Sequence, residues 1–138
     1  MVVTELLSIY SQGSGDSVNI TAQVQNVVDK SGVQEGSVLV FYRHTTGALL
    51  LIEHEAGIFV DLENVFEKIV PVCGLYNHHL RGYDENGAAH IKTALLNVSI
   101  VVPILDGSLL LGKFQEILML DMDVGAKFRE IVVQISGD

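Results

Sequence analysis

The chain is poor in the features that mark a secreted or membrane protein. Its single cysteine, Cys73, cannot form an internal disulfide, which suits a reducing compartment. Residues 1–10 lack the basic region and the small-residue cleavage site of a signal peptide. No apolar run approaches the roughly 20 residues that cross a bilayer. These absences predict a cytoplasmic protein without a membrane-spanning segment.

Basic residues are also scarce. Eight Lys and Arg residues stand against 17 Asp and Glu residues, and the formal net charge is −9. The eight cations are scattered, so no run of them can follow a phosphate backbone. This pattern argues against nucleic acid as a partner, and against an anionic membrane surface for the same reason.

Apolar residues are abundant for a chain of this size, at 49% against 18% charged. A length of 138 residues fits a single domain, residues 1–138. A small domain has a large surface relative to its volume, so the apolar excess predicts a buried interface in an oligomer. A dense core rich in β-structure is the alternative.

The spacing of apolar residues predicts an α+β fold in which strands outnumber helices. We expect a functional polar loop over 72–85, because long loops in compact domains often carry function. Helices are predicted over 20–30, 57–70 and 87–96, the last with Asn86 as its N-cap. Strands are predicted over 2–10, 36–44, 48–53, 98–104, 108–121 and 129–136, with a hairpin at Asp106-Gly107. The clustering of strands toward the C-terminus favours a largely antiparallel arrangement.

The first candidate site is His44-Thr45-Thr46, at the end of an apolar strand. A histidine in that place can act as a metal ligand or a general base. The alternative is a hydrogen-bonded turn at the end of the strand, since threonine hydroxyls satisfy backbone groups well.

The second candidate lies in and after the polar loop, where His78, Asp84, Asn86 and His90 fall within a short stretch. Imidazoles and a carboxylate that converge can hold Zn²⁺ or another transition metal. The start of the predicted helix also favours an anion such as phosphate. A solvated loop followed by a capped helix is the alternative.

The third candidate is Gln115, which interrupts an apolar strand, together with Asp121, Asp123 and Arg129. A polar residue on a buried face must find a partner, which makes Gln115 a site candidate. The alternative is the outward face of an edge strand, with acids that are simply solvated.

In their order and spacing these stretches resemble the YjbQ family, often described as secondary thiamine-phosphate synthases. The likeness covers roughly residues 17–136. Its motifs are His44-Thr45-Thr46, Glu53, Asp61-Leu62, Tyr76-x-His78, Asn86-x-x-Ala89-His90, Pro103-Ile104, Asp106-Gly107, Leu111-Gly112, Gln115, Asp121 and Arg129. The chain departs from the usual pattern at Phe114, where Trp is common, and at Gly47, where Ala is usual. It also has Asn97 in place of a common Gly, and Lys127 where a second Arg is expected.

The resemblance implies an α+β protomer with a mainly antiparallel, β-sandwich-like core and about three helices. It implies a homotrimer with a polar site near a subunit boundary. It also implies weak thiamine-phosphate synthase activity, in which a pyrimidine diphosphate joins a thiazole phosphate and diphosphate leaves.

The hypothesis that follows is a metal-assisted transferase acting on a small phosphorylated molecule. A divalent metal on His44, His78 and His90 would neutralise the departing diphosphate. Imidazoles suit Zn²⁺, whereas diphosphate chemistry more often uses Mg²⁺, so both ions stay open. Residues expected to bind or orient the substrate are Thr45, Thr46, Asn86, Gln115 and Arg129.

Two further readings stay open. In a metal-assisted hydrolase, Glu53 or Asp61 would act as the acid or base, with Asn86 and Gln115 orienting substrate or water. In a binding module, the same histidines would hold a metal or a small anion without turnover.

Overall fold

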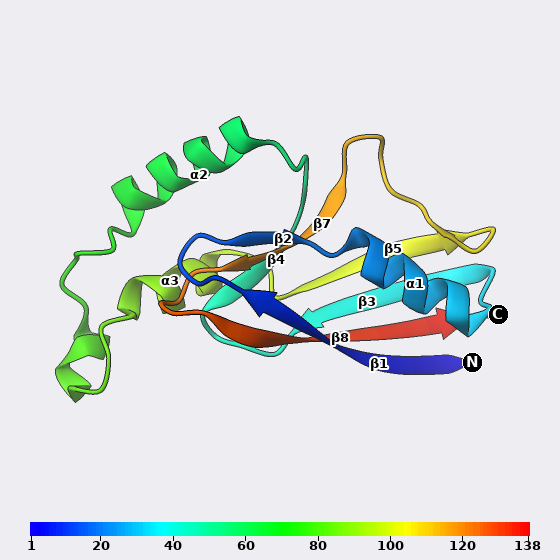
Figure 1. Cartoon of the computed structure of the whole chain (residues 1–138), viewed down its shortest axis with the longest axis horizontal. Coiled ribbons are helices and arrows are strands. Elements are labelled where there is room, and N and C mark those ends of the chain that lie inside the picture. The colour runs from blue at the N-terminus through cyan, green and yellow to red at the C-terminus, as the bar shows by residue number, and fades with distance from the viewer.

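The computed structural model describes all 138 residues and builds them around two antiparallel sheets (Figure 1). The larger sheet has five strands in the order β1-β8-β3-β5-β6. These strands are β1 (Val2–Ser11), β8 (Lys127–Gly137), β3 (Glu35–Tyr42), β5 (Ser99–Leu105) and β6 (Ser108–Leu109). All their pairings are antiparallel, as the sequence predicted.

The smaller sheet has three strands in the order β2-β7-β4. They are β2 (Ser17–Asn19), β7 (Glu116–Asp121) and β4 (Gly47–Ile52). In the central strand β7, Ile117 and Met119 belong to the main core, whereas Leu118 and Leu120 belong to a second apolar cluster. Successive side chains of a strand point to opposite faces, so the apolar run of β7 serves two cores at once.

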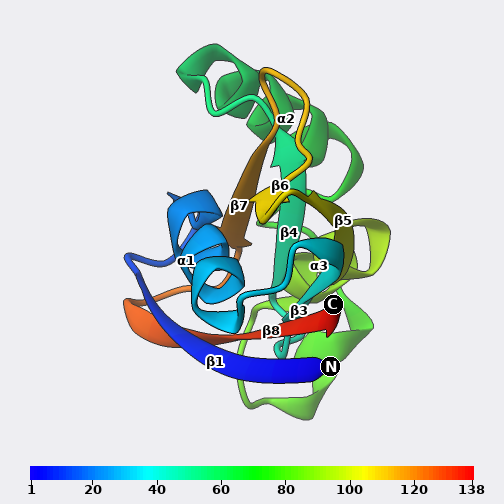
Figure 2. The ribbon, with the colours of Figure 1, turned by 90° about the vertical axis from the view of Figure 1, so that its right-hand side faces the viewer.

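Three helices complete the predicted α+β fold, which the structure confirms. They are α1 (Thr21–Ser31), α2 (Ala56–Ile69) and α3 (Gly87–Leu95), and a short 3₁₀ helix, η1 (Asn77–Arg81), lies in the polar loop. Helix α1 contacts strands of both sheets and buries three valines among them (Figure 2). It ends at Gly32, whose φ of 73° lies in the left-handed region that glycine adopts most easily. No helix is long and apolar enough to cross a membrane.

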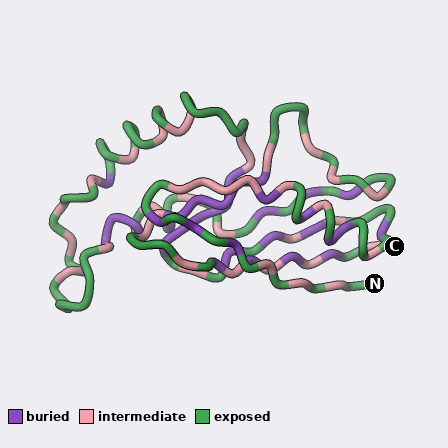
Figure 3. The backbone as a smooth tube through the Cα atoms, in the orientation of Figure 1, coloured by how far each residue is buried: buried purple, intermediate pink, exposed green.

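Helix α2 is held far less tightly than α1 and α3, both of which have buried residues. None of its residues is buried, and Figure 3 shows exposed and intermediate colours along almost its whole length. Only one stripe, carrying Phe59, Leu62 and Phe66, packs on the outer cluster of the small sheet. The side chain of Glu55 caps its start by accepting from two backbone N–H groups.

One expectation about local structure was wrong. Residues 108–121 do not form one long strand, because β6 and β7 belong to different sheets and the chain crosses between them through 110–115. That crossing contains a turn in which Gln115 Oε1 accepts from the Gly112 N–H at 2.8 Å. Cys73, the single cysteine, is exposed.

Candidate functional site

A buried ion pair joins the ends of three strands. Arg129 Nε donates to Asp121 Oδ2 at 2.9 Å, and Nη2 donates to Oδ1 at 2.6 Å. The same Nη2 donates to Thr46 Oγ1 at 2.9 Å. Both charged side chains are almost inaccessible to solvent. Strand alternation turns Arg129 inward, on the same side as the buried Ile131, so its charge requires a fixed partner there.

The pair stays ionised because each charge stabilises the other. Burial by itself would raise the pKa of Asp121, but the hydrogen bonds from Arg129, Ser11 and the Asp123 backbone, together with the charge of Arg129, hold that pKa below its usual value. Burial would also lower the pKa of Arg129, but the hydrogen bond from Arg129 to Asp121 and the nearby negative charges together keep it above its usual value. As a result, the Arg129 guanidinium is largely occupied within the protein, with Nε and Nη2 both engaged.

Tyr42 packs over this pair, and the sequence analysis did not single it out. Its ring centroid lies 5.7 Å from Arg129 Cζ. Its hydroxyl is buried without a hydrogen-bond partner, and burial raises its pKa. A Cβ placed on Gly47 would lie 2.2 Å from Tyr42 Cε1. Gly47, where Ala is the expected residue, therefore makes room for the Tyr42 ring.

A second network runs from the ion pair to the polar loop. The Asp123 N–H donates to Asp121 Oδ1 at 3.0 Å, and Asn86 Nδ2 donates to Asp123 Oδ2 at 3.3 Å. The Asn86 Oδ1 lies 3.1 Å from His78 Nε2, and Asp84 Oδ1 lies 3.2 Å from that same nitrogen. Two oxygen acceptors favour a proton on His78 Nε2.

Arg81 and His90 are the other close neighbours of His78. Arg81 Nη2 is 3.2 Å from His78 Nε2, and as a cation it can only donate. If His78 carries its proton on Nε2, both this nitrogen and Arg81 Nη2 are donors, so no hydrogen bond joins them. The His78 and His90 rings lie with centroids 4.5 Å apart, so the loop does bring these two predicted residues together.

His44 lies just after the end of β3, and a backbone hydrogen bond from β8 holds its ring. Its Nε2 accepts from the Glu130 N–H at 2.9 Å, which places the ring proton on Nδ1. Burial, and then the nearby charge of Arg129, lowers the pKa of His44. His44 is therefore a neutral imidazole with one free donor at neutral pH.

A hollow of about 780 Å³ lies between the His44 segment and helix α3. Its polar lining comes from both sides, with His44 and Thr45 on one and His90 and Thr93 on the other. Two of the three stretches predicted from the sequence therefore meet at one place.

The family model described as UPF0047 protein YjbQ-like matches residues 5–138, nearly the whole chain. This chain belongs to the YjbQ family.

Several YjbQ relatives cover almost the same length. A UPF0047 protein of Methanothermobacter thermautotrophicus is 34% identical over 136 residues, which is 99% of this chain and 93% of that one. One of Archaeoglobus fulgidus is 40% identical over 117 residues, covering 85% and 88%. A crystal structure from Sulfolobus solfataricus, of a YbjQ-like protein of unknown function, superposes with a TM-score of 0.89 at 30% identity, over the whole of both chains.

Other residues expected at the site from the YjbQ motifs lie elsewhere in the protomer. Gln115 is exposed, just before β7, and Asp121 ends that strand, which spans about 17 Å from Glu116 at the usual rise per residue. Glu53 follows Ile52, which pairs with Glu116 at the same far end. Asp61 is exposed on α2.

The residues do not fit the expected three-histidine metal centre. Nowhere in the chain do three or more His, Cys, Asp or Glu side chains gather so that they could hold a metal ion. His78 and His90 lie together, but Nε2 of His44 already accepts a backbone hydrogen bond. A ligand set would therefore need a rearrangement of the His44 segment.

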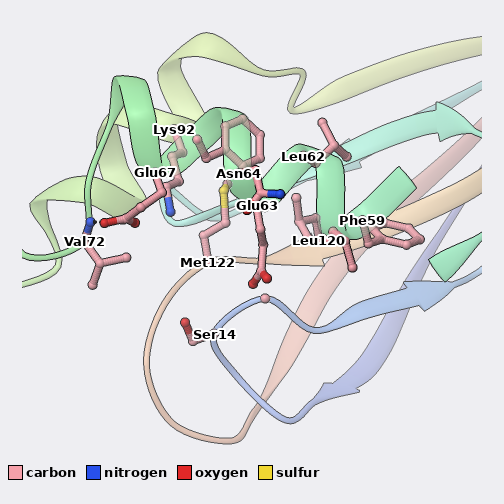
Figure 4. Close-up of a pocket in the computed structure, with 13 residues that line it drawn as sticks. Ser14, Phe59, Leu62, Glu63, Asn64, Glu67, Val72, Lys92, Leu120 and Met122 are labelled. Carbon is pink, nitrogen blue, oxygen red and sulfur yellow. Dashed lines mark hydrogen bonds between the residues drawn. The ribbon is translucent and has the colours of Figure 1, made fainter. Parts of the chain in front are cut away.

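A second hollow, of about 460 Å³, lies between α2 and the small sheet (Figure 4). Leu120 and Met122 line it from the sheet, and Phe66 lines it from the helix. Lys92 of α3 stands over the Phe66 ring, 5.6 Å from its centroid. This hollow contains none of the residues predicted for the site.

Proposed function

We propose that the hollow between His44 and His90 binds a small phosphorylated molecule. The observation that carries the proposal is the convergence of imidazoles and hydroxyls on it from separate segments. The Thr93 hydroxyl already donates to the Ala89 carbonyl, but His44 offers an Nδ1–H donor and Thr45 offers a hydroxyl. Such donors suit phosphate oxygens, and they provide local attraction for an anion in a chain of net charge −9.

The reaction we propose is weak thiamine-phosphate synthesis, as the family resemblance implies. The thiazole nitrogen would attack the methylene carbon of the pyrimidine diphosphate. Its lone pair would form the new C–N bond, and diphosphate would leave with the electrons of the broken C–O bond. The imidazoles would hydrogen-bond the departing diphosphate, so that its developing charge is stabilised.

A divalent ion, Zn²⁺ or Mg²⁺, is a separate part of this proposal. His78 and His90 supply two imidazoles for it, but the three-histidine set does not fit as arranged. No step of the reaction is therefore assigned to a metal. Elemental analysis of the purified protein before and after a chelator tests this part by itself.

We also propose that the chain assembles as a homotrimer through the outer face of the large sheet. No helix covers this face (Figure 2), although it carries a series of exposed apolar side chains. They are Val2, Leu6 and Tyr10 of β1, Phe128 of β8, Phe41 of β3, and Val101 and Leu105 of β5. An exposed apolar face of this kind favours association.

A binding protein without turnover is the second candidate function. It is favoured by the position of Glu53 and Asp61, which lie outside the hollow in the protomer. The same geometry counts against a hydrolase that uses either carboxylate in its own chain.

The test measures both binding and turnover in the purified protein. Calorimetry with inorganic diphosphate reports binding, and thiamine phosphate formation with excess substrates reports turnover. His90→Ala should abolish both, whereas His54→Ala, a histidine outside the hollow, should change neither. Binding without product would favour the second candidate. Full binding and turnover in His90→Ala would show that the site lies elsewhere.

A further inference from the structure

The hollow between α2 and the small sheet, which we call the α2 hollow, shares no lining residue with the hollow beside His44. Its volume of about 460 Å³ lies within the range of small-molecule pockets, roughly 300–1,000 Å³. Leu120 and Met122 line it from the sheet side and Phe66 from the helix (Figure 4). Although Phe66 packs on this side of the sheet, no residue of α2 is buried, so apolar surface still faces water. A ligand with an apolar body would remove that surface from water.

One positive charge borders the α2 hollow. Lys92 of α3 is partly buried, and its ammonium lies 5.6 Å from the centroid of the Phe66 ring. Lys92 takes part in none of the ion pairs of the chain. An ammonium that is partly withdrawn from water and has no carboxylate within ion-pair distance favours an anionic group on a ligand.

Two negative charges border the same hollow. Glu63 and Glu67 lie one turn apart on α2 and therefore on the same side of the helix. Glu67 Oε2 accepts from the Val72 N–H at 3.3 Å, whereas Glu63 takes part in no ion pair. Glu63 extends toward the turn before β2, where its Oε1 would lie 3.1 Å from a Cβ on Gly15 (Figure 4). Like charges at this spacing destabilise a helix, so a cation beside them would stabilise α2.

From the two signs of charge around an apolar hollow we propose that the α2 hollow binds a free amino acid with an apolar side chain. Such a molecule carries an ammonium and a carboxylate on one apolar body. Its carboxylate would accept from the Lys92 ammonium, and its own ammonium would donate to Glu63. Its side chain would contact Leu120 and Met122. This site goes beyond the proposed function, since none of its residues lines the hollow beside His44.

Ligands with a single charge match this lining less well. An apolar carboxylate would meet Lys92, but it would also bring a third negative charge next to Glu63 and Glu67. An apolar amine would meet the two glutamates but would leave Lys92 without a counter-charge. A molecule that carries both charges avoids both penalties, because each of its charges lies next to one of opposite sign.

Binding would also hold α2 more firmly on the sheet. The ligand would contact both walls of the hollow, whereas in the free chain α2 meets the small sheet through one apolar stripe. We expect amide hydrogen exchange in α2 to slow by about tenfold at a ligand concentration about ten times the Kd, because the ligand must leave before the helix opens.

The test is calorimetry of the purified protein with L-leucine, L-methionine and L-phenylalanine. N-acetyl-L-leucine, which lacks the ammonium, and L-leucinamide, which lacks the carboxylate, are the matched ligands. We expect at least one of the three amino acids to bind. If it is L-leucine, each matched ligand should bind at least about tenfold more weakly, as loss of a charge-assisted hydrogen bond implies. The corresponding N-acetyl and amide derivatives serve if the ligand is L-methionine or L-phenylalanine.

Substitutions then locate the site. Lys92→Met removes the charge and keeps an unbranched side chain, and Glu63→Gln removes the other charge at constant length. Each should weaken binding of the amino acid by about tenfold or more. Lys68→Met is the matched control, because Lys68 also belongs to the α2 segment but does not line the hollow. It should leave binding unchanged.

Absence of binding by all three amino acids would overturn the proposal. Equal affinity for the N-acetyl or the amide derivative would also overturn it, since the site would then recognise one charge only. Unchanged binding in Lys92→Met, or slower exchange only outside α2, would show that the ligand binds elsewhere. None of these measurements uses diphosphate. Failure to bind diphosphate would therefore count against the proposed function without affecting the α2 hollow.

Discussion

Two regions of the small sheet, the Asp121 end of β7 and the outer face beneath α2, are held together by different kinds of contact. At the Asp121 end of β7, a bidentate buried ion pair and a chain of hydrogen bonds fix each side chain by specific partners. On the outer face, α2 rests on a single apolar stripe and has no buried residue. Directional contacts hold polar groups in place for chemistry, whereas a loosely packed helix can adjust its position. This contrast indicates that the polar side chains at the Asp121 end of β7 are preorganised.

The strongest test of this contrast is Asp121→Ala. It leaves the Arg129 charge buried without its partner, so we expect a loss of about 3–5 kcal/mol in the free energy of unfolding. Urea denaturation followed by circular dichroism measures the loss. Arg43→Ala is the matched control, since its ion pair with Glu130 is about half exposed. That variant should lose no more than about 1 kcal/mol. Equal losses in the two variants would show that the buried ion pair contributes no more to stability than the exposed one.

The next test asks whether Gly47 is required by Tyr42. Gly47→Ala should cost about 1–3 kcal/mol, because the new methyl overlaps the Tyr42 ring. In a Tyr42→Leu background the same change should cost much less, since the ring is gone. A double-mutant cycle from urea denaturation measures the coupling. Additive losses would show that glycine at this position serves another purpose.

Much of the fold was predictable because its signals are local. Helical spacing identified α1, α2 and α3, and Asp106-Gly107 identified the β5–β6 hairpin. The switch of sheets between β6 and β7 was missed because the apolar runs on the two sides of residues 112–116 were interpreted as one strand. Periodicity alone does not show that such a run serves two sheets.

The site was predictable only in part, for a similar reason. His78, Asn86 and His90 are close in sequence, so local spacing could indicate their meeting. The role of Tyr42 depends on its contact with Gly47, and sequence reveals a glycine without revealing what approaches it. Asn86 shows the converse limit, since its N-cap position was correct although its side chain has another partner.

The smallest expected effect on stability is that of a substitution in α2, the loosely packed helix. Phe66→Ala removes a half-buried ring from α2, and we expect a loss of about 1 kcal/mol, well below the 3–5 kcal/mol typical of a fully buried phenylalanine. The small value follows because the ring already borders an open hollow, so little new cavity forms. Hydrogen exchange should accelerate within α2 while the amides of β7 stay protected. If β7 amides lost protection as well, α2 would be part of the same cooperative unit as the Asp121 end, and the contrast between the two sides would fail.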